Sequence, residues 1–178
     1  MAGTAETACI VLTGMPGVGK STLGVLLAKA TARDFVDTDV VIQAREHRTL
    51  QQIAEAAGRE GFRDIECEAI CALDCPGAVV ATGGSVIYRD AAMQHLRNIG
   101  VVVFLDLAIA PLLERLGDLD ARGVSRTPGQ TIEDLYLERK PLYRRYAHVT
   151  VDLTGMNHDE AEAAVRAAAE AYLEGAFQ

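Results

Sequence analysis

A glycine-rich segment at residues 14–22 constrains this chain more than any other feature. It reads Gly-Met-Pro-Gly-Val-Gly-Lys-Ser-Thr and fits the pattern G-x-x-x-x-G-K-[ST], in which glycines let the backbone turn its amides toward a bound anion. An apolar run over 8–12 precedes the segment, and apolar residues at helical spacing follow it. The sequence therefore predicts a strand, a phosphate-binding loop and a helix, in that order, within a nucleotide-binding α/β fold.

The chemistry of this segment indicates how it would contact a nucleotide. The backbone amides and the helix N-terminus would hold the β-phosphate, Lys20 would bridge the β- and γ-phosphates, and the Ser21 hydroxyl would ligate Mg²⁺. The alternative is a glycine-rich turn with a chance lysine, which the strand and helix on either side disfavour. The residues expected to contact ATP here are Gly14, Gly17, Val18, Gly19, Lys20, Ser21 and Thr22.

The length and composition of the chain limit the remaining choices. Its 178 residues suit a single domain over 1–178, and a hydrophobic content of 49% with a mean hydropathy of +0.12 is typical of a folded protein. No apolar stretch approaches the roughly 18 residues of a membrane span, and residues 1–7 do not resemble a signal peptide. A net charge of −8 argues against nucleic acid as a partner. We therefore expect a cytoplasmic monomer that binds neither membranes nor nucleic acid.

The four cysteines do not suggest a disulfide framework. Cys9 lies in the first predicted strand, whereas Cys67, Cys71 and Cys75 recur every four residues, which would place them on one face of a helix. A metal site is one interpretation, but the spacing is not that of a zinc knuckle. Small buried apolar side chains in a reducing cytoplasm are the favoured interpretation.

Apolar runs and helical patterns alternate along the chain. The runs predicted to be strands are 8–13, 35–37, 79–82, 101–105 and 149–151. The helical patterns are 21–31, 49–57, 65–73, 91–99, 110–116, 132–146 and 160–173. This alternation predicts a parallel sheet with helices on both faces and a ligand at the carboxyl ends of the strands. Residues 117–130, which contain Arg122 and Arg126, are interpreted as a lid over the nucleotide, with a plain surface loop as the alternative.

Polar residues and glycines follow the second and third predicted strands. Asp37 and Asp39 stand at the end of the second strand, and Gly83 and Gly84 at the end of the third. Asp37 is placed to meet Mg²⁺ directly or through water, and Asp39 to accept a proton from a substrate hydroxyl. The alternatives are helix capping for the aspartates and a tight turn for the glycines. The functional interpretation is favoured because two carboxylates beside a phosphate loop would repel ATP unless a cation or a proton donor used them.

Five segments together resemble the shikimate kinase family in order and spacing. They are 14–22, 37–39, 62–66 (Phe-Arg-Asp-Ile-Glu), 82–84 (Thr-Gly-Gly) and 139–143 (Arg-Lys-Pro-Leu-Tyr). The resemblance, which extends from residue 10 to residue 152, implies ATP-dependent phosphorylation of the shikimate 3-hydroxyl in aromatic amino acid biosynthesis. It also implies a P-loop kinase fold with a five-stranded parallel sheet in the order 2-3-1-4-5.

The resemblance assigns roles to single residues as well. Arg63 and Arg139 would clamp the substrate carboxylate, and Asp39 would bind the ring hydroxyls and orient the attacking one. The backbone of Gly83 and Gly84 would lie against the ring. For each arginine taken singly, a surface salt bridge is the alternative.

The resemblance extends to two further arginines, and the sequence departs from the family pattern in two places. Arg126 in the lid would reach the transferring phosphoryl group, and Arg115 matches the position that stacks on adenine. Ser85 stands where the family usually has a third glycine, and residues 126–129 read Arg-Thr-Pro-Gly where the family usually has Arg-Pro-Leu. A smaller hydroxylated carboxylate such as homoserine is therefore the alternative acceptor. Two other classes of protein are alternatives. The carboxylate clamp argues against a nucleotide kinase, and the presence of the phosphate-loop residues argues against a non-catalytic ATP-binding module.

Overall fold

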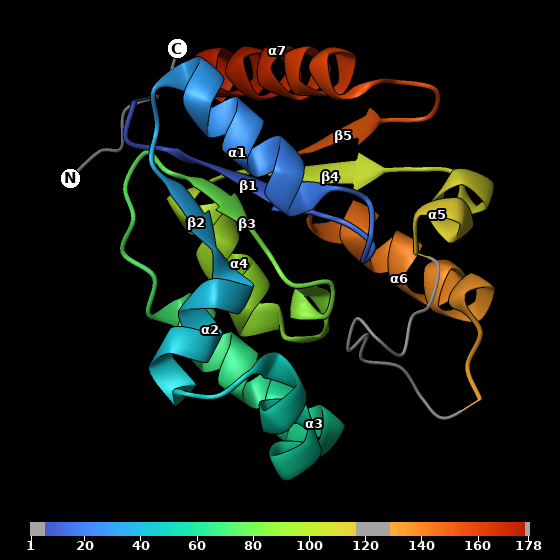
Figure 1. Ribbon diagram of the computed structural model, residues 1–178. Coiled ribbons are helices and arrows are strands. Elements are labelled where there is room, and N and C mark those ends of the chain that lie inside the picture. Colours follow the sequence, from blue (N-terminus) through green and yellow to red (C-terminus); the bar gives the residue numbers. More distant parts are fainter. Residues whose placement is uncertain (1–5, 117–128, 177–178) are drawn as a thin grey trace.

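The computed structural model describes residues 6–116 and 129–176 of the chain (Figure 1). The strands are β1 (Cys9–Thr13), β2 (Phe35–Asp37), β3 (Val79–Ala81), β4 (Gly100–Asp106) and β5 (Val149–Asp152). The helices are α1 (Lys20–Thr31), α2 (Thr38–Glu46), α3 (Leu50–Cys71), the 3-10 helix η1 (Val86–Tyr88), α4 (Asp90–Ile99), α5 (Ile109–Leu116), α6 (Ile132–Tyr146) and α7 (His158–Ala176). None of the helices in these two ranges has both the length and the apolar character needed to cross a membrane.

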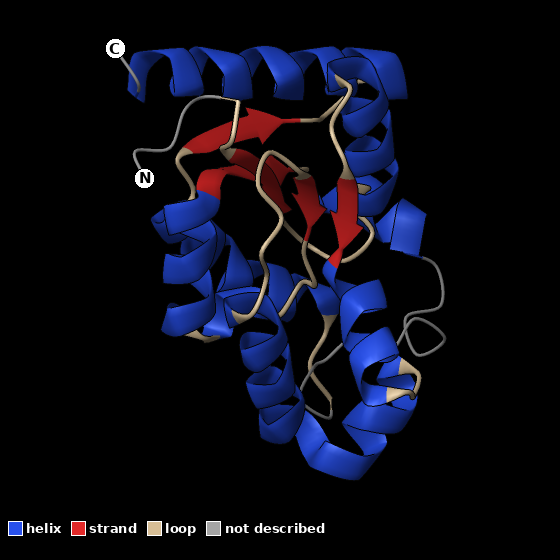
Figure 2. Cartoon of the chain, turned by 90° about the vertical axis from the view of Figure 1, so that its left-hand side faces the viewer, coloured by secondary structure: helices blue, strands red, loops and turns tan. Residues whose placement is uncertain are grey.

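The strands form one parallel sheet in the order β2-β3-β1-β4-β5, which confirms the predicted topology. Helices α1 and α7 cover one face of the sheet, and α4 and α6 cover the other (Figures 1 and 2). The central strand β1 is buried along its whole length, as its unbroken apolar run requires in a sheet covered on both faces. Because all strands run the same way, the loops that follow β1, β2 and β3 meet at one edge of the sheet.

Helix α3 differs most from the sequence-based prediction, which placed separate helices at 49–57 and 65–73. The helix runs from Leu50 to Cys71 and is interrupted only at Gly58, where φ is 67° and ψ is −178°. Thr49 caps it and forms a capping box with Gln52. The intervening residues 59–64 contain Gly61 and, apart from Phe62, no apolar side chain, so they lack the apolar periodicity on which the prediction relied. They are nevertheless helical, and they carry Arg63 toward the site described below.

The cysteines are only in part as predicted. Helix α3 ends at Cys71, so Cys75 lies in the loop before β3 and does not share a helix face with Cys67 and Cys71. All four thiols are free, but only Cys9 is fully buried, and Cys71 is exposed. No group of three or more potential metal-ligating side chains gathers anywhere in residues 6–116 and 129–176. The four-residue spacing therefore does not mark a uniform set of core positions.

Candidate active site

The loop between β1 and α1 forms a cradle at the carboxyl edge of the sheet. Gly14 has a φ of 149°, and a Cβ there would lie 2.7 Å from the carbonyl oxygen of Leu105, so a side chain does not fit. Gly19, with a φ of 107°, forms the N-cap of α1. The first-turn amides of α1 have no partners within the helix and open toward this loop. Such a loop suits a phosphate, because backbone N–H groups and the helix dipole both favour an anion.

Lys20 reaches from the start of α1 back into the loop. Its side chain is buried, and Nζ donates to the carbonyl oxygens of Gly14 at 2.9 Å and Met15 at 3.0 Å. Burial lowers the pKa of Lys20 to about 8, while the negative charge of Asp39 acts in the opposite direction. Both hydrogen-bond acceptors are neutral, so they hold the ammonium group at the loop without cancelling its charge.

Ser21 and Asp37 bring hard oxygen atoms together beside the loop. The Ser21 hydroxyl donates to Asp37 Oδ2 at 2.6 Å, while Asp37 Oδ1 accepts from the backbone N–H of Asp39 at 2.9 Å and so caps α2. The capping and metal-binding interpretations of Asp37 are therefore compatible, because they use different oxygens. Hydroxyl and carboxylate oxygens are the ligands that Mg²⁺ prefers, and their place next to a phosphate cradle fits that ion.

Asp39 lies in the first turn of α2, against the turn that follows β3. Burial raises the pKa of its carboxyl group, repulsion from Asp37 adds to this, and Lys20 opposes it. The backbone N–H of Gly83 donates to the Thr38 hydroxyl at 3.1 Å, which ties the two segments together. Asp39 Oδ1 lies 3.0 Å from where a Cβ on Gly83 would stand, so the close approach depends on glycine. A carboxylate with a raised pKa is a stronger base, which suits the acceptance of a proton from a hydroxyl.

Two buried arginines, Arg63 and Arg139, lie against the ring of Tyr88. Arg139, on α6, donates from Nε to the Tyr88 hydroxyl at 3.2 Å and from Nη1 to the carbonyl of Gly84 at 3.1 Å. Arg63, on α3, lies with its guanidinium carbon 3.7 Å from the centre of the Tyr88 ring, and its Nη1 donates to Glu60 at 2.6 Å. Arg63 Nε and Nη2 are buried and have no hydrogen-bond partner in the described part of the chain. Buried, unsatisfied guanidinium donors are costly in a folded protein, and a carboxylate is the ligand whose geometry they match.

Many of these groups, but not Asp37, Arg63 or Tyr88, line a cavity of about 380 Å³ at the carboxyl edge of the sheet. Several predicted contact residues line it together, namely Gly17, Gly19, Lys20, Ser21, Thr22, Asp39, Gly83, Gly84 and Arg139. The cavity thus joins the phosphate cradle to the carboxylate Asp39 and the cation Arg139. Its two ends can bind an anionic phosphate chain and a hydroxylated, negatively charged small molecule next to each other.

Other predicted site residues lie apart from this cavity or outside the described residues. Arg115, at the end of α5, is exposed and donates to the carbonyl of Val18 at 3.3 Å. It lines a separate cavity of about 170 Å³ that also reaches Gly19 and Asn157, on the far side of the phosphate loop. The predicted lid over 117–130 lies almost entirely outside the described residues, as does Arg126. The roles given to the lid and to Arg126 therefore remain predictions.

Glu66 and Tyr88 had no predicted role, but Glu66 lines the cavity and Tyr88 accepts a hydrogen bond from Arg139. Glu66 is only 2% exposed, lines the cavity from α3, and follows Arg63 by three residues on the same helix face. Two charged residues at helical spacing on the inward-facing side of a helix are a pattern from which a role for Glu66 could be predicted. The sequence contains no comparable signal for Tyr88, which meets both arginines only through tertiary packing.

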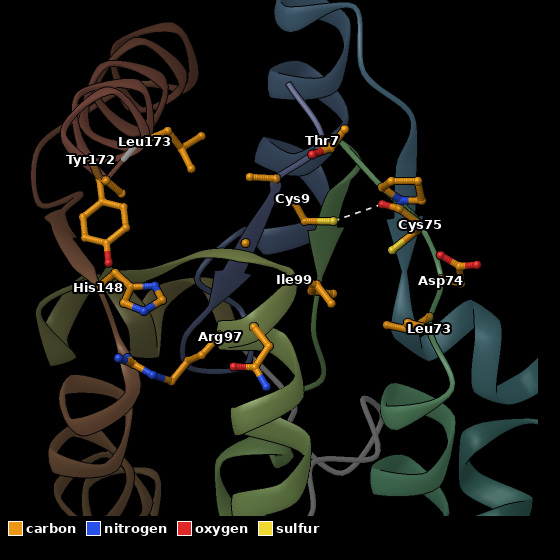
Figure 3. Close-up of a pocket in the computed structure, with 15 residues that line it drawn as sticks. Thr7, Cys9, Leu73, Asp74, Cys75, Arg97, Ile99, His148, Tyr172 and Leu173 are labelled. Atoms are coloured by element: carbon orange, nitrogen blue, oxygen red, sulfur yellow. Dashed lines mark hydrogen bonds between the residues drawn. The ribbon is translucent and has the colours of Figure 1, made fainter. Parts of the chain in front are cut away.

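A second cavity, of about 440 Å³, opens at the amino ends of the strands (Figure 3). Cys9 in this cavity donates its thiol proton to the carbonyl of Cys75 at 3.0 Å, and His148 stacks on Tyr172 with ring centres 4.9 Å apart. Arg97 in this cavity donates to the carbonyl of Tyr146. The residues that line the cavity include none from the phosphate loop. Ligands of open parallel sheets bind at the carboxyl ends of the strands, so the cavity of about 380 Å³ at that edge is the candidate active site.

Comparison with known proteins agrees with this geometry. A family model described as shikimate kinase matches residues 16–171. The chain is 39% identical over 148 residues to shikimate kinase 2 of Enterobacter sp. (strain 638), covering 80% of this chain and 85% of that protein. It is 35% identical over 154 residues to the shikimate kinase of Clostridium botulinum, covering 85% and 90% of the two chains. The solved structure of the shikimate kinase from Acinetobacter baumannii in complex with shikimate superposes with a TM-score of 0.77 at 32% identity, covering 96% and 94% of the two chains.

Proposed function

Because this chain belongs to the shikimate kinase family, we propose that it transfers the γ-phosphoryl group of ATP to the 3-hydroxyl of shikimate. The observation that carries the proposal is the pair of buried arginines that both lie against the Tyr88 ring, of which Arg139 lines the cavity that also contains the phosphate loop. A cyclic carboxylic acid with several hydroxyls fits between such a clamp and Asp39. The matched relatives give no support to homoserine as the acceptor.

At the nucleotide end, the backbone of the phosphate loop and Lys20 would hold the β- and γ-phosphates. The oxygens of Ser21 and Asp37 would hold Mg²⁺, which when bound would neutralise phosphate charge. Arg115 would lie against the base of the nucleotide, and its hydrogen bond to the carbonyl of Val18 in the phosphate loop supports this role. We retain Arg126 as the expected cation from the lid.

At the acceptor end, Arg63 and Arg139 would fix the carboxylate with paired N–H groups, which a planar guanidinium provides and an ammonium does not. Asp39 would accept a hydrogen bond from the reacting hydroxyl and aim its oxygen at the γ-phosphorus. Phosphoryl transfer passes through a loose transition state whose charge lies mainly on the phosphoryl oxygens, so positioning and positive charge supply most of the catalysis. Lys20, which the phosphate loop holds through two carbonyl groups, would supply positive charge there.

An acceptor screen tests the proposal directly. ADP release should be measured with ATP and Mg²⁺ alone, with shikimate, with homoserine and with AMP, and the product identified by phosphorus NMR. Shikimate should stimulate ADP release strongly and yield the 3-phosphate, whereas homoserine and AMP should leave the basal rate unchanged. A rate that responds to AMP, or to none of the three, would overturn the proposal.

The remaining expectations from the sequence are part of the same proposal. We propose that the enzyme is a cytoplasmic monomer, because its reaction consumes ATP and because one chain supplies both the phosphate loop and the acceptor wall. Size-exclusion chromatography with light scattering, at several protein concentrations, checks the oligomeric state.

A further inference from the structure

A hydrogen bond between two buried side chains joins α3 to the turn after β3, and both side chains line the acceptor cavity. The hydroxyl of Ser85, in the turn between β3 and η1, donates to Glu66 Oε2 on α3 at 2.7 Å. Ser85 is 5% exposed and Glu66 2%, so water does not compete for this bond. A glycine at position 85 would leave Glu66 Oε2 without this donor.

The other oxygen of the same carboxyl group has no partner. Glu66 Oε1 is buried and accepts no hydrogen bond from any described residue. It lies only 2.3 Å from where a Cβ on Gly83 would stand, so it rests against the glycine turn. Glu66, Ser85, Gly83 and Asp39 all line the 380 Å³ cavity. An unsatisfied buried acceptor in the wall of a binding cavity indicates that a ligand supplies the missing donor.

The charges around Glu66 favour a hydroxyl as that donor. Burial raises the pKa of Glu66 to about 7, the hydrogen bond from Ser85 acts to lower it, and Asp39 acts to raise it. The positive charges of Arg139, on α6, and of Arg63, three residues earlier on α3, act to lower it. Ser85 thus favours the ionised form, which only accepts hydrogen bonds, and the nearby guanidinium groups attract the acceptor's carboxylate away from Glu66.

Of the polar groups on shikimate, two ring hydroxyls remain once the arginines hold the carboxylate and Asp39 holds the reacting hydroxyl. We propose that Ser85 is a positioning residue that fixes Glu66 Oε2, so that Glu66 Oε1 accepts a hydrogen bond from a non-reacting ring hydroxyl of shikimate. This inference rests on the proposed function. It gives Ser85 a part in acceptor recognition that a glycine could not perform, and it accounts for the unsatisfied oxygen.

The test combines variants with altered acceptors. Ser85→Ala, Glu66→Gln and the double variant would be compared with wild type for KM of shikimate, KM of ATP and kcat. Thr31→Ala is the matched control, since the Thr31 hydroxyl also donates one hydrogen bond, to the carbonyl of Leu27 at 2.7 Å, but lies at the far end of α1. Wild type and Ser85→Ala would also be assayed with 4-deoxyshikimate and 5-deoxyshikimate.

Ser85→Ala should raise KM for shikimate about tenfold while kcat and KM for ATP change less than about twofold, as expected for loss of one buried, charge-assisted hydrogen bond. The double variant should be no worse than Glu66→Gln alone, because Ser85 acts through Glu66. With the deoxy analogue that lacks the contacting hydroxyl, wild type should itself show the raised KM, and Ser85→Ala should add little.

The contrary results separate the two proposals. If wild type phosphorylates shikimate but Ser85→Ala keeps its KM, or the double variant shows additive losses, the role of Ser85 is overturned and the proposed function stands. If neither deoxy analogue binds wild type more weakly than shikimate does, the hydroxyl contact is overturned without any variant. If wild type does not phosphorylate shikimate, both proposals are overturned.

Discussion

The two ends of the sheet carry cavities of similar volume and opposite character. At the carboxyl edge, the charged groups of Lys20, Arg63, Glu66 and Arg139 are all nearly inaccessible to water. At the amino edge, Asp74 is exposed, Arg97 is half-buried, and the side chains bond to the protein's own carbonyls or stack on one another. Burying a charge is costly unless a partner compensates for it, so the carboxyl edge is built for a charged ligand. Cavity size alone would have selected the wrong end, because the amino-edge cavity is the larger.

The largest effect is expected at Lys20. Lys20→Ala should lower kcat about 10²–10³-fold, because it removes a preorganised positive charge from the place where phosphoryl charge develops. The melting temperature should stay close to that of wild type, since the ammonium group faces the loop and not the apolar core. Stopped-time ADP assays and calorimetry measure both quantities. Lys29→Ala, on the exposed side of α1, serves as the control. Near-normal turnover in Lys20→Ala would contradict the phosphate-loop assignment.

The next effect concerns the arginine clamp. Arg63→Lys and Arg139→Lys should each raise KM for shikimate by a factor equivalent to about 2 kcal/mol, because lysine keeps the charge and loses the paired donors. KM for ATP should change little in either variant. Arg166→Lys, on the exposed face of α7 beside Glu162, is the matched control. Unchanged shikimate KM in both clamp variants would mean that the buried charges at this edge serve the fold and not the ligand.

A pH series would show whether burying the Glu66 carboxyl group lowers the free energy of unfolding. The pKa of Glu66 is raised to about 7 in the folded protein. Between the ordinary pKa of a glutamate and pH 7, Glu66 is therefore protonated in the folded protein and ionised in the unfolded chain. The protein's free energy of unfolding therefore falls as pH rises through that window. Glu66→Gln removes this titration, so the variant should gain about 2 kcal/mol relative to wild type between pH 5 and pH 8.

Urea unfolding at each pH measures this gain. Glu170→Gln, at an exposed position on α7, should follow the wild-type curve throughout. Parallel curves for Glu66→Gln and wild type would show that Glu66 titrates at its ordinary value in the folded protein, and the electrostatic contrast between the two edges would be weaker than the structure indicates.

The smallest effect is expected at the amino edge. Tyr172→Ala removes the ring that stacks on His148 and should lower the free energy of unfolding by about 1 kcal/mol. The kcat/KM for shikimate should remain within about twofold of wild type, because no group of this cavity reaches the phosphate loop. A large fall in kcat/KM with intact stability would break the comparison, because it would couple the larger cavity to catalysis.

The features that the sequence predicted well depend on residues that are close together along the chain. The phosphate loop is contiguous, so its glycines, Lys20 and Ser21 could be interpreted without knowledge of the fold. The alternation of apolar runs and helical patterns gave all five strands to within about two residues, and the family resemblance gave their order. Asp37 and Asp39 were correctly placed at the end of β2, because parallel strands bring their carboxyl ends to one edge. The prediction failed in α3, where a largely polar stretch with Gly61 concealed a continuous helix, and it included no helix at the position of α2.

Only the tertiary structure decided which side chains meet across the cavity. Ser85 and Glu66 are 19 residues apart, and Tyr88 and Arg139 are 51 apart, so no local pattern records their contacts. Periodicity indicates which face of an element is buried, but it does not show which neighbour that face meets. Likewise, an unsatisfied donor on Arg63 or acceptor on Glu66 is defined by the absence of partners in three dimensions. The sequence by itself therefore determined the phosphate-loop motif and its place at the carboxyl edge of a parallel sheet, and the packing of α3, α6 and η1 decided which side chains meet at the proposed acceptor site.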